Sequence, residues 1–246
     1  MKYNYNGWEL QSFDAANNFR DYQNKIIIKY IKGKVAEVGP GNGVNSELFL
    51  KRLKKLFLYE PSYKLYKNLK KKYKNKKKIK IFNSKFKKKS KKFDTILYLD
   101  VLEHILDHKK ELNSAIFSLK RGGHLIINVP AFSFLYSNFD KDVGHYKRYN
   151  IGNFKKILKG LSYNNVEFKY YLNLRGSGTY GVDRLQDLAH KILGLQPVNQ
   201  VNDLVRMPSK TWVGLGGEYS NIVKSVDTLS QTLGVQFYLG SDKVEL

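Results

Sequence analysis

The chain has 246 residues, of which 42% are hydrophobic and 26% charged, and its formal net charge at pH 7 is +23. This balance is typical of a globular protein and argues against global disorder, and no apolar run approaches the roughly eighteen residues of a membrane span. The absence of cysteine excludes disulfides, cysteine-based metal sites and thiol nucleophiles, and together with an N-terminus that lacks a signal-like apolar segment it favours a cytoplasmic location.

Helix and strand patterns alternate along the first two thirds of the chain. Apolar residues at helical intervals predict a helix over 12–31, followed by a short strand at 34–38 and a glycine-rich turn. The patterns then predict, in order, a helix near 46–55 capped by Asn45 or Ser46, a strand at 56–59, a lysine-rich helix over 62–74, strands near 79–82 and 93–99, a helix near 109–120 ended by Arg121-Gly122-Gly123, and a strand at 124–129. Such alternation predicts βαβ units in an α/β fold with a doubly wound, mostly parallel sheet, in which ligands bind beyond the carboxyl ends of the strands.

The positive charge is confined to one part of the chain. Residues 1–174 contain 37 Lys and Arg against 14 Asp and Glu, an excess of 37 − 14 = 23, whereas residues 175–246 contain 7 of each kind. The excess is densest over 51–92, where 19 Lys and Arg52 face only Glu60. Two interpretations stay open: a surface that binds RNA or anionic lipid, and lysine used as a generic surface residue, which the single arginine favours.

The turn after the first strand, Glu37-Val38-Gly39-Pro40-Gly41-Asn42-Gly43, is the most informative segment. Glycines let the backbone turn tightly and approach a ligand closely. A dinucleotide-binding fingerprint, G-x-G-x-x-G, would need its third glycine at Val44, so the observed spacing disfavours a nicotinamide-dependent oxidoreductase.

The acidic residue that precedes this turn points to a cationic ligand. Glu37 would repel a pyrophosphate, since two like charges 4 Å apart cost about 4 kcal/mol at an effective dielectric constant of about 20. S-adenosylmethionine (SAM) carries an ammonium and a sulfonium group and no phosphate. Glu60 follows the next strand, and a carboxylate there can accept hydrogen bonds from ribose hydroxyls. An ordinary glycine turn with two surface acids is the alternative.

Five segments in this order resemble the class I SAM-dependent methyltransferases. They are EVGPGNG (37–43), YEPS (59–62), FDTILYLDVLEHILD (93–107), LKRGGHLIINVP (119–130) and FDKDVGHYKRY (139–149). The resemblance covers roughly residues 12–174 and is strongest to small-molecule methyltransferases with a D-x-LEH segment. It implies a Rossmann-like fold, SAM as the cofactor and a small-molecule acceptor.

The resemblance also implies roles for single residues. The methionine part of SAM is expected at Glu37, Gly39, Gly41 and Gly43, the ribose at Glu60 with Pro61 beside it, and the sulfonium region at Asp100, Val101 and Leu102, with Phe19 of the N-terminal helix as a cap. One position departs from the pattern. Many relatives have an acid after the third strand that binds the adenine amino group, whereas this chain has Asn83 and Ser84.

A base is needed if the acceptor is a hydroxyl or an amine, because the proton must leave. His145 is the predicted catalytic residue, since histidine titrates near neutral pH and this one lies in the loop after the fifth strand. Bracing of that loop is the alternative role. The neighbouring loop residues predicted to face the substrate are Asp140, Tyr146, Arg148 and Tyr149.

A metal ion is not expected from the sequence. His104 and His108 have the i, i+4 spacing of a metal-binding pair, and Asp107 is close to them, but a third ligand is not evident. His104 is therefore expected to pack or form a hydrogen bond beside the site.

The segment Leu99-Asp100-Val101-Leu102 lacks the N/D-P-P-Y pattern of many methyltransferases that act on base or amide nitrogen. This favours an oxygen or carbon acceptor on a small metabolite, lipid or sugar. The alternatives are an RNA methyltransferase or RNA-binding protein that uses the lysine-rich surface, and an inactive scaffold with an intact fold.

The patterns and the resemblance together predict three segments: an N-terminal cap-helix region at 1–32, a SAM-binding core at 33–174 and a C-terminal extension at 175–246. An antiparallel strand pair is expected to finish the sheet, with one strand at 166–172 and the other at 210–214 or 235–239. Helices are predicted at 182–193 and 220–233. The role of the extension does not follow from the sequence.

Overall fold

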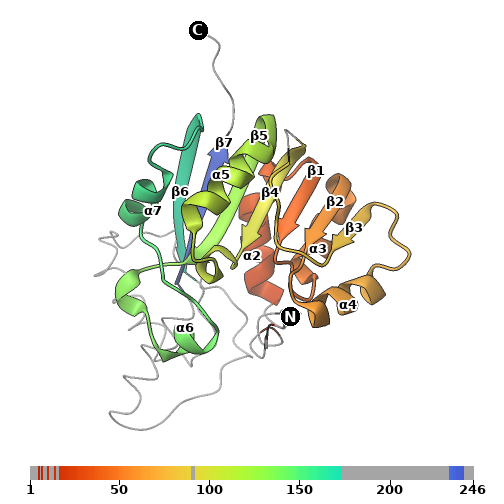
Figure 1. Cartoon of the computed structure of the whole chain (residues 1–246), viewed down its shortest axis with the longest axis horizontal. Coiled ribbons are helices and arrows are strands. Elements are labelled where there is room, and N and C mark those ends of the chain that lie inside the picture. Colours follow the sequence, from red (N-terminus) through yellow and green to blue (C-terminus); the bar gives the residue numbers. More distant parts are fainter. Residues whose placement is uncertain are drawn as a thin grey trace. The chain divides into compact units, whose positions relative to one another are not determined.

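The computed structural model describes Tyr5, Gly7, Leu10, Asp14 and residues 17–89, 92–172 and 233–240. Its elements in chain order are α2 (Asn17–Ile27), η1 (Ile28–Tyr30), β1 (Gly33–Val38), α3 (Val44–Phe49), η2 (Leu50–Arg52), β2 (Leu53–Tyr59), α4 (Tyr63–Lys72), β3 (Ile79–Phe82), β4 (Phe93–Leu99), η3 (Leu102–His104), α5 (His108–Ser118), β5 (Leu119–Pro130), η4 (Ser133–Leu135), α6 (Asn138–Asp142), α7 (Ile151–Leu158), β6 (Asn165–Leu172) and β7 (Leu233–Gly240) (Figure 1).

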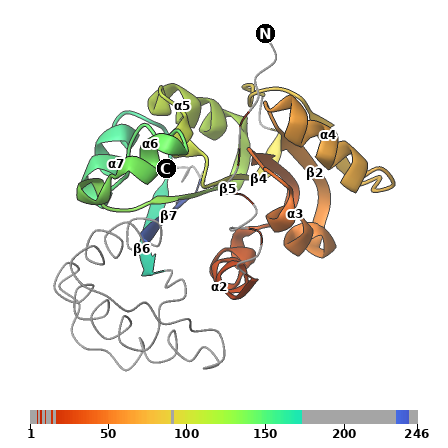
Figure 2. The same cartoon turned by 90° about the horizontal axis from the view of Figure 1, so that it is seen from below.

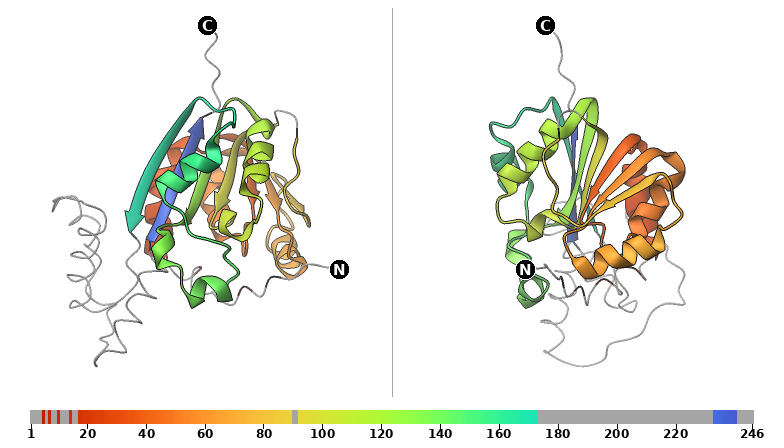
Figure 3. Two further views of the ribbon diagram at one scale, coloured as in Figure 1. Left: turned by 60° about the vertical axis from the view of Figure 1, so that its left-hand side comes forward. Right: turned by 45° about the vertical axis from the view of Figure 1, so that its right-hand side comes forward.

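The strands form one seven-stranded sheet in the order β3-β2-β1-β4-β5-β7-β6. The five strands from β3 to β5 pair in parallel, and β7 pairs antiparallel with β5 (Figure 3). The order reverses between β1 and β4, which is the switch point where ligands bind in such sheets. The predicted α/β class with a mostly parallel, doubly wound sheet is confirmed.

Both faces of the sheet are covered, and the central strands are therefore apolar along most of their length. On one face, Ile27 of α2, Phe49 of α3 and Leu69 of α4 pack in one core cluster with the strand residues Leu56 and Leu97. Helices α5, α6 and α7 lie on the other side (Figure 2). None of the described helices is both long and apolar enough to cross a membrane.

Two predicted helix ends and one predicted cap are wrong. The helix expected near 46–55 ends by Arg52, and β2 begins at Leu53. The helix expected near 109–120 ends at Ser118, and β5 begins at Leu119 because Leu119 already pairs with Phe93 of β4. The predicted helix stop at 121–123 thus lies inside a strand. Helix α3 begins after Gly43, and the hydroxyl of Ser46 is bonded elsewhere, as described below.

The last two strands occur where the sequence pattern placed them. β6 coincides with the predicted strand at 166–172, and β7 contains the predicted strand at 235–239. The alternative strand at 210–214, the helix at 182–193 and all but the last residue of the helix at 220–233 lie outside the described residues; Leu233 begins β7. The chain divides into two compact units, 1–171 with 234–246, and 172–233. The predicted boundaries after residues 32 and 174 stay a prediction.

Candidate functional site

The glycine turn at the carboxyl end of β1 needs its glycines for two different reasons. Gly39, Gly41 and Gly43 have φ angles of 63°, 58° and 72°, in the left-handed region that glycine tolerates best. A Cβ atom on Gly39 would lie 2.7 Å from Val101, and one on Gly43 would lie 2.7 Å from Leu69. Gly41 has no such close contact, since its nearest neighbour would be 3.6 Å away. The turn is therefore packed tightly at both ends, whereas a Cβ atom in the middle would meet Leu10 at ordinary van der Waals distance.

Two buried carboxyl groups flank this turn. Glu37 is 2% exposed and accepts a hydrogen bond from the hydroxyl of Ser46, and burial raises its pKa to about 7. Glu60 is 4% exposed; its carboxylate accepts hydrogen bonds from the backbone N–H of Ser62 at 2.8 Å and of Gly41 at 3.3 Å. Burial raises the pKa of Glu60 to about 7 as well. The loss of hydration that causes both shifts would be offset by a bound cation.

The carboxyl ends of β4 and β5 carry backbone strain. Asp100 and Phe132, which follow these two strands, have φ angles of 56° and 61°, and they are the non-glycine residues with positive φ in the described part of the chain. Asp100 is held by Asn128, whose side-chain amide donates to its carboxylate and whose carbonyl accepts its N–H at 3.0 Å. Strain of this kind is concentrated at functional sites. The strained positions lie at the edge of the sheet that β1 and β2 also reach with the glycine turn and Glu60.

The remaining residues predicted to contact the cofactor lie close to this edge. Val101 packs against the glycine turn, and Leu102 in η3 is fully buried. The carbonyl of Pro61 accepts a hydrogen bond at 3.1 Å from the side chain of Asn83, so Asn83 ties the end of β3 to the end of β2. Phe19 lies in α2, and its side chain is outside the described part of the structure.

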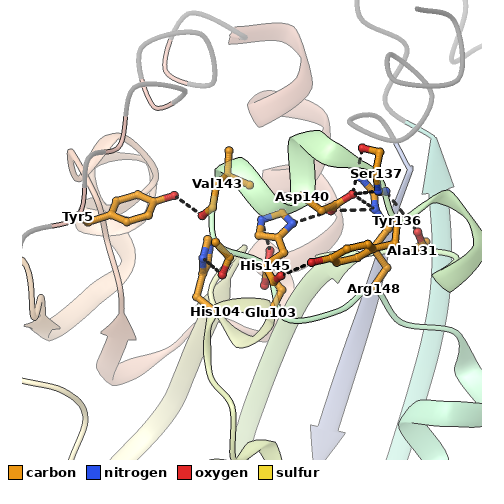
Figure 4. Close-up of polar contacts among 11 residues, drawn as sticks. Tyr5, Glu103, His104, Ala131, Tyr136, Ser137, Asp140, Val143, His145 and Arg148 are labelled. Carbon is orange, nitrogen blue, oxygen red and sulfur yellow. Dashed lines mark hydrogen bonds and ion pairs between the residues drawn. The ribbon is translucent and has the colours of Figure 1, made fainter. Parts of the chain in front are cut away.

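The loop after β5 is built around one buried carboxylate (Figure 4). Asp140 is fully buried and accepts hydrogen bonds from His145 Nδ1 at 2.7 Å and from Arg148 Nε at 2.8 and 2.9 Å. It also accepts from the backbone N–H of Ser137 and so caps α6. Burial raises the pKa of Asp140, but the hydrogen bonds from His145 and Arg148 outweigh burial and hold that pKa below its usual value. The hydroxyl of Tyr136 donates to the carbonyl of His145 at 2.7 Å and fixes the loop further.

The other side of the His145 ring faces two residues of η3 (Figure 4). Its Nε2 lies 3.9 Å from a carboxylate oxygen of Glu103, and its ring centroid lies 4.7 Å from that of His104. His104 Nδ1 is 3.2 Å from the carbonyl oxygen of Gly144, and burial lowers the pKa of His104 to about 4. Glu103 is 1% exposed; burial and the charge of Asp100 raise its pKa well above the usual value. The sequence analysis gave Glu103 no role, although it is the glutamate of the D-x-LEH segment.

This geometry can now be set beside known proteins. Residues 19–167, more than half of the chain, match the family described as "Methyltransferase domain". The chain belongs to this family. It is a class I methyltransferase that uses SAM, as the sequence resemblance implied. No curated protein matches the sequence.

Solved structures with the same fold differ widely from this methyltransferase in sequence. Phosphoethanolamine N-methyltransferase 2 of Haemonchus contortus, crystallised with SAM, is 15% identical with a TM-score of 0.58, covering 91% of this chain and 53% of its own. A SAM-dependent methyltransferase of Archaeoglobus fulgidus is 14% identical with a TM-score of 0.58, covering 94% and 97%. A chain from the complex of the Haloferax volcanii Trm112 methyltransferase activator with a methyltransferase is 11% identical with a TM-score of 0.62, covering 97% and 98%.

The structure separates the remaining loop residues of the methyltransferase into an open and a buried group. Tyr146 is 56% exposed, whereas Arg148 and Tyr149 are buried and help to hold the loop. His104 and His108, whose spacing is that of a helical pair, do not share a helix, because η3 ends at His104 and α5 begins only at His108. His108 instead contacts the ring of Tyr149.

Proposed function

We propose that this methyltransferase transfers the methyl group of SAM to an oxygen or carbon atom of a small metabolite, lipid or sugar. The observation that carries the proposal is the pair of buried carboxyl groups, Glu37 and Glu60, that flank the glycine turn. Two acids with little hydration suit a cationic donor and oppose a pyrophosphate.

In this proposal SAM lies across the carboxyl ends of β1, β2 and β4. Its methionine part contacts Glu37 and the turn that contains Gly39, Gly41 and Gly43, and its ribose hydroxyls donate to Glu60 beside Pro61. The sulfonium group lies near Asp100, Val101 and Leu102, and Phe19 covers the cofactor. The strained backbone at Asp100 supports a role at the reacting end.

The reaction is an in-line displacement on an activated donor. A bond forms between the acceptor atom and the methyl carbon, the carbon–sulfur bond breaks, and its electron pair stays on sulfur. The protein mainly aligns the two reactants and excludes water. The loop after β5, with its exposed Tyr146, is the surface that we assign to the acceptor.

His145 is the residue that we assign to activation of the acceptor. Because its Nδ1 bonds to Asp140, the N–H of the neutral ring lies there and the lone pair lies on Nε2. Nε2 is thus the atom through which His145 acts on an acceptor hydroxyl. Asp140 orients the ring in this account.

The nature of the acceptor rests on the sequence after β4, which lacks the N/D-P-P-Y pattern of many nitrogen methyltransferases. A cytoplasmic location is part of the proposal, supported by a chain without cysteine.

A second candidate, RNA as the acceptor, is favoured by one observation. A hollow of about 640 Å³ beside the edge strand β3 is lined by residues that include the lysines 70, 74, 76, 77 and 80 and the aromatic Phe82. Contacts with phosphates release counterions, so RNA binding there would weaken steeply as salt is raised. An affinity for RNA that does not change with salt would remove this candidate.

The proposed function is tested by calorimetry with SAM and with NADH, followed by transfer of labelled methyl groups to a panel of hydroxylated metabolites, lipids and sugars. We expect a heat of binding with SAM and none with NADH. We expect the label in a methyl group attached to oxygen or carbon. Binding of NADH instead, or label found only on nitrogen, would contradict the proposal.

A further inference from the structure

Three side chains with metal-binding groups converge beside the carboxyl end of β4. Glu103, His104 and His145 each offer one ligand atom, and these three atoms all lie within 4.8 Å of one another. Figure 4 shows the two imidazole rings and the carboxylate side by side, with His145 reaching them from the loop after β5. The proposed methyl transfer assigns a role to His145 but none to Glu103 or His104.

Both imidazole rings are oriented as metal ligands usually are. His145 Nδ1 bonds to the carboxylate of Asp140 at 2.7 Å, and His104 Nδ1 lies 3.2 Å from the carbonyl oxygen of Gly144. An oxygen acceptor at Nδ1 keeps the proton of the neutral ring there and leaves the lone pair on Nε2. This outer contact, to a carboxylate or a backbone carbonyl, is the arrangement that accompanies almost every metal-bound histidine.

Glu103 supplies an independent observation. Its side chain is 1% exposed, and its Oε2 has no hydrogen-bond partner in the described part of the chain. A buried carboxylate oxygen without a partner is costly, and the nearby charge of Asp100 adds to the cost. A divalent cation between Glu103 and the two imidazole rings would remove both penalties.

We propose that Glu103, His104 and His145 bind a divalent transition-metal ion beside the acceptor site. Two nitrogen ligands and one carboxylate are a set that such ions prefer. Ligand atoms on one ion are at most about 4 Å apart, so the cluster has to contract by less than about 1 Å when the ion binds. The inference rests on the proposed function, because it assigns the ion to the same acceptor site.

The ion defines how His145 acts. With Nε2 held by the metal, the ring does not take up the acceptor's proton itself. A bound ion would act as a Lewis acid, and an acceptor hydroxyl beside it would lose its proton to water more readily. The resulting oxygen attacks the methyl carbon of SAM, the carbon–sulfur bond breaks, and the electron pair stays on sulfur; the ion is unchanged.

Direct binding of Co²⁺ to the full chain tests the inference. After treatment with a chelator, the protein is titrated with Co²⁺ alone, and binding is followed by calorimetry and by the visible absorption of the bound ion. We expect one ion per chain. In Glu103→Gln and in His104→Ala the affinity should fall by at least about tenfold, whereas His124→Gln, a histidine of β5 outside the cluster, should bind as the wild type does.

The same samples are titrated with SAM, which shows whether each variant is folded and separates the two proposals. Protein that binds SAM but shows no Co²⁺ binding tighter than about 1 mM overturns the metal site and leaves the methyl-transfer proposal standing. Equal Co²⁺ affinity in the wild type and in the cluster variants also overturns it. Specific Co²⁺ binding by protein that does not bind SAM supports the metal site and contradicts the proposed function.

Discussion

The carboxylate of Glu37 accepts a hydrogen bond from the hydroxyl of Ser46, which lies nine residues further along the chain. The bond joins the end of strand β1 to helix α3 across the glycine turn, and both side chains are buried. The neutral hydroxyl provides one hydrogen bond to the carboxylate but does not cancel its negative charge. Glu37 is thus held in place while its charge stays available for a cationic ligand.

Replacement of Glu37 by Gln should weaken SAM binding by about tenfold or more, because the amide keeps the size of the side chain and removes its charge. Calorimetry with SAM measures the loss, and circular dichroism checks the fold. Glu47→Gln is the matched control, since Glu47 lies on the same helix as Ser46 with a side chain that is 51% exposed. Equal affinities in the two variants would contradict the assignment of Glu37.

The affinity for SAM should rise between about pH 6 and about pH 8. Burial raises the pKa of Glu37 and of Glu60 to about 7, so both groups hold protons below that pH. A cationic ligand favours the ionised carboxylates; binding therefore releases protons at low pH and becomes tighter as the pH rises. Titrations in two buffers with different heats of ionisation count the released protons. A flat profile in the wild type would count against this coupling, and Glu60→Gln should make the profile shallower.

Alanine substitutions at Gly41 and Gly43 should separate binding from stability. At Gly43 the new Cβ atom would lie 2.7 Å from Leu69 in a left-handed backbone conformation, so Gly43→Ala should destabilise the fold by about 1–3 kcal/mol. At Gly41 the backbone is also left-handed, but the new Cβ atom would meet Leu10 at an ordinary contact distance of 3.6 Å; Gly41→Ala should therefore cost less stability than Gly43→Ala and should lower SAM affinity more than it lowers stability. Urea unfolding and SAM calorimetry on both variants check this. The reverse pattern would place the cofactor away from Gly41.

Removal of the Arg148 side chain should unfold or loosen the loop after β5. Arg148 is 2% exposed, and its Nε donates to both carboxylate oxygens of the fully buried Asp140. Arg148→Met removes the main hydrogen-bond donor to that carboxylate and should lower the free energy of unfolding by about 3–5 kcal/mol. Lys141→Met on the exposed side of the same loop is the control. A loss below about 1 kcal/mol would mean that the loop tolerates the unpaired acid.

The parallel strands could be predicted closely from the sequence. A run such as 93–99 is apolar almost throughout because both faces of the sheet are covered, and the glycine turn at 39–43 follows its strand directly. The end of α5 could not be predicted, because it depends on the pairing of Leu119 with Phe93 on another strand. Local periodicity carries no information on such pairing.

Only some of the residues on the acceptor side of the site could be predicted from the sequence. His145 and Asp140 are five residues apart, and both were predicted to lie in one loop. Glu103 and His104 meet His145 only because the strand order brings the ends of β4 and β5 together. A contact over some forty residues of chain leaves no local pattern, and this is why the carboxylate of Glu103 was missed.

The position of β7 between β5 and β6 has a consequence for synthesis on the ribosome. β5 is complete at residue 130, but the strand that covers its free edge is made only at residues 233–240. During translation the nascent chain therefore carries an open, apolar strand edge for about a hundred residues, which is the kind of surface that pairs with other chains. Protection of that edge by a chaperone, or rapid elongation through this stretch, would favour a good yield of folded enzyme.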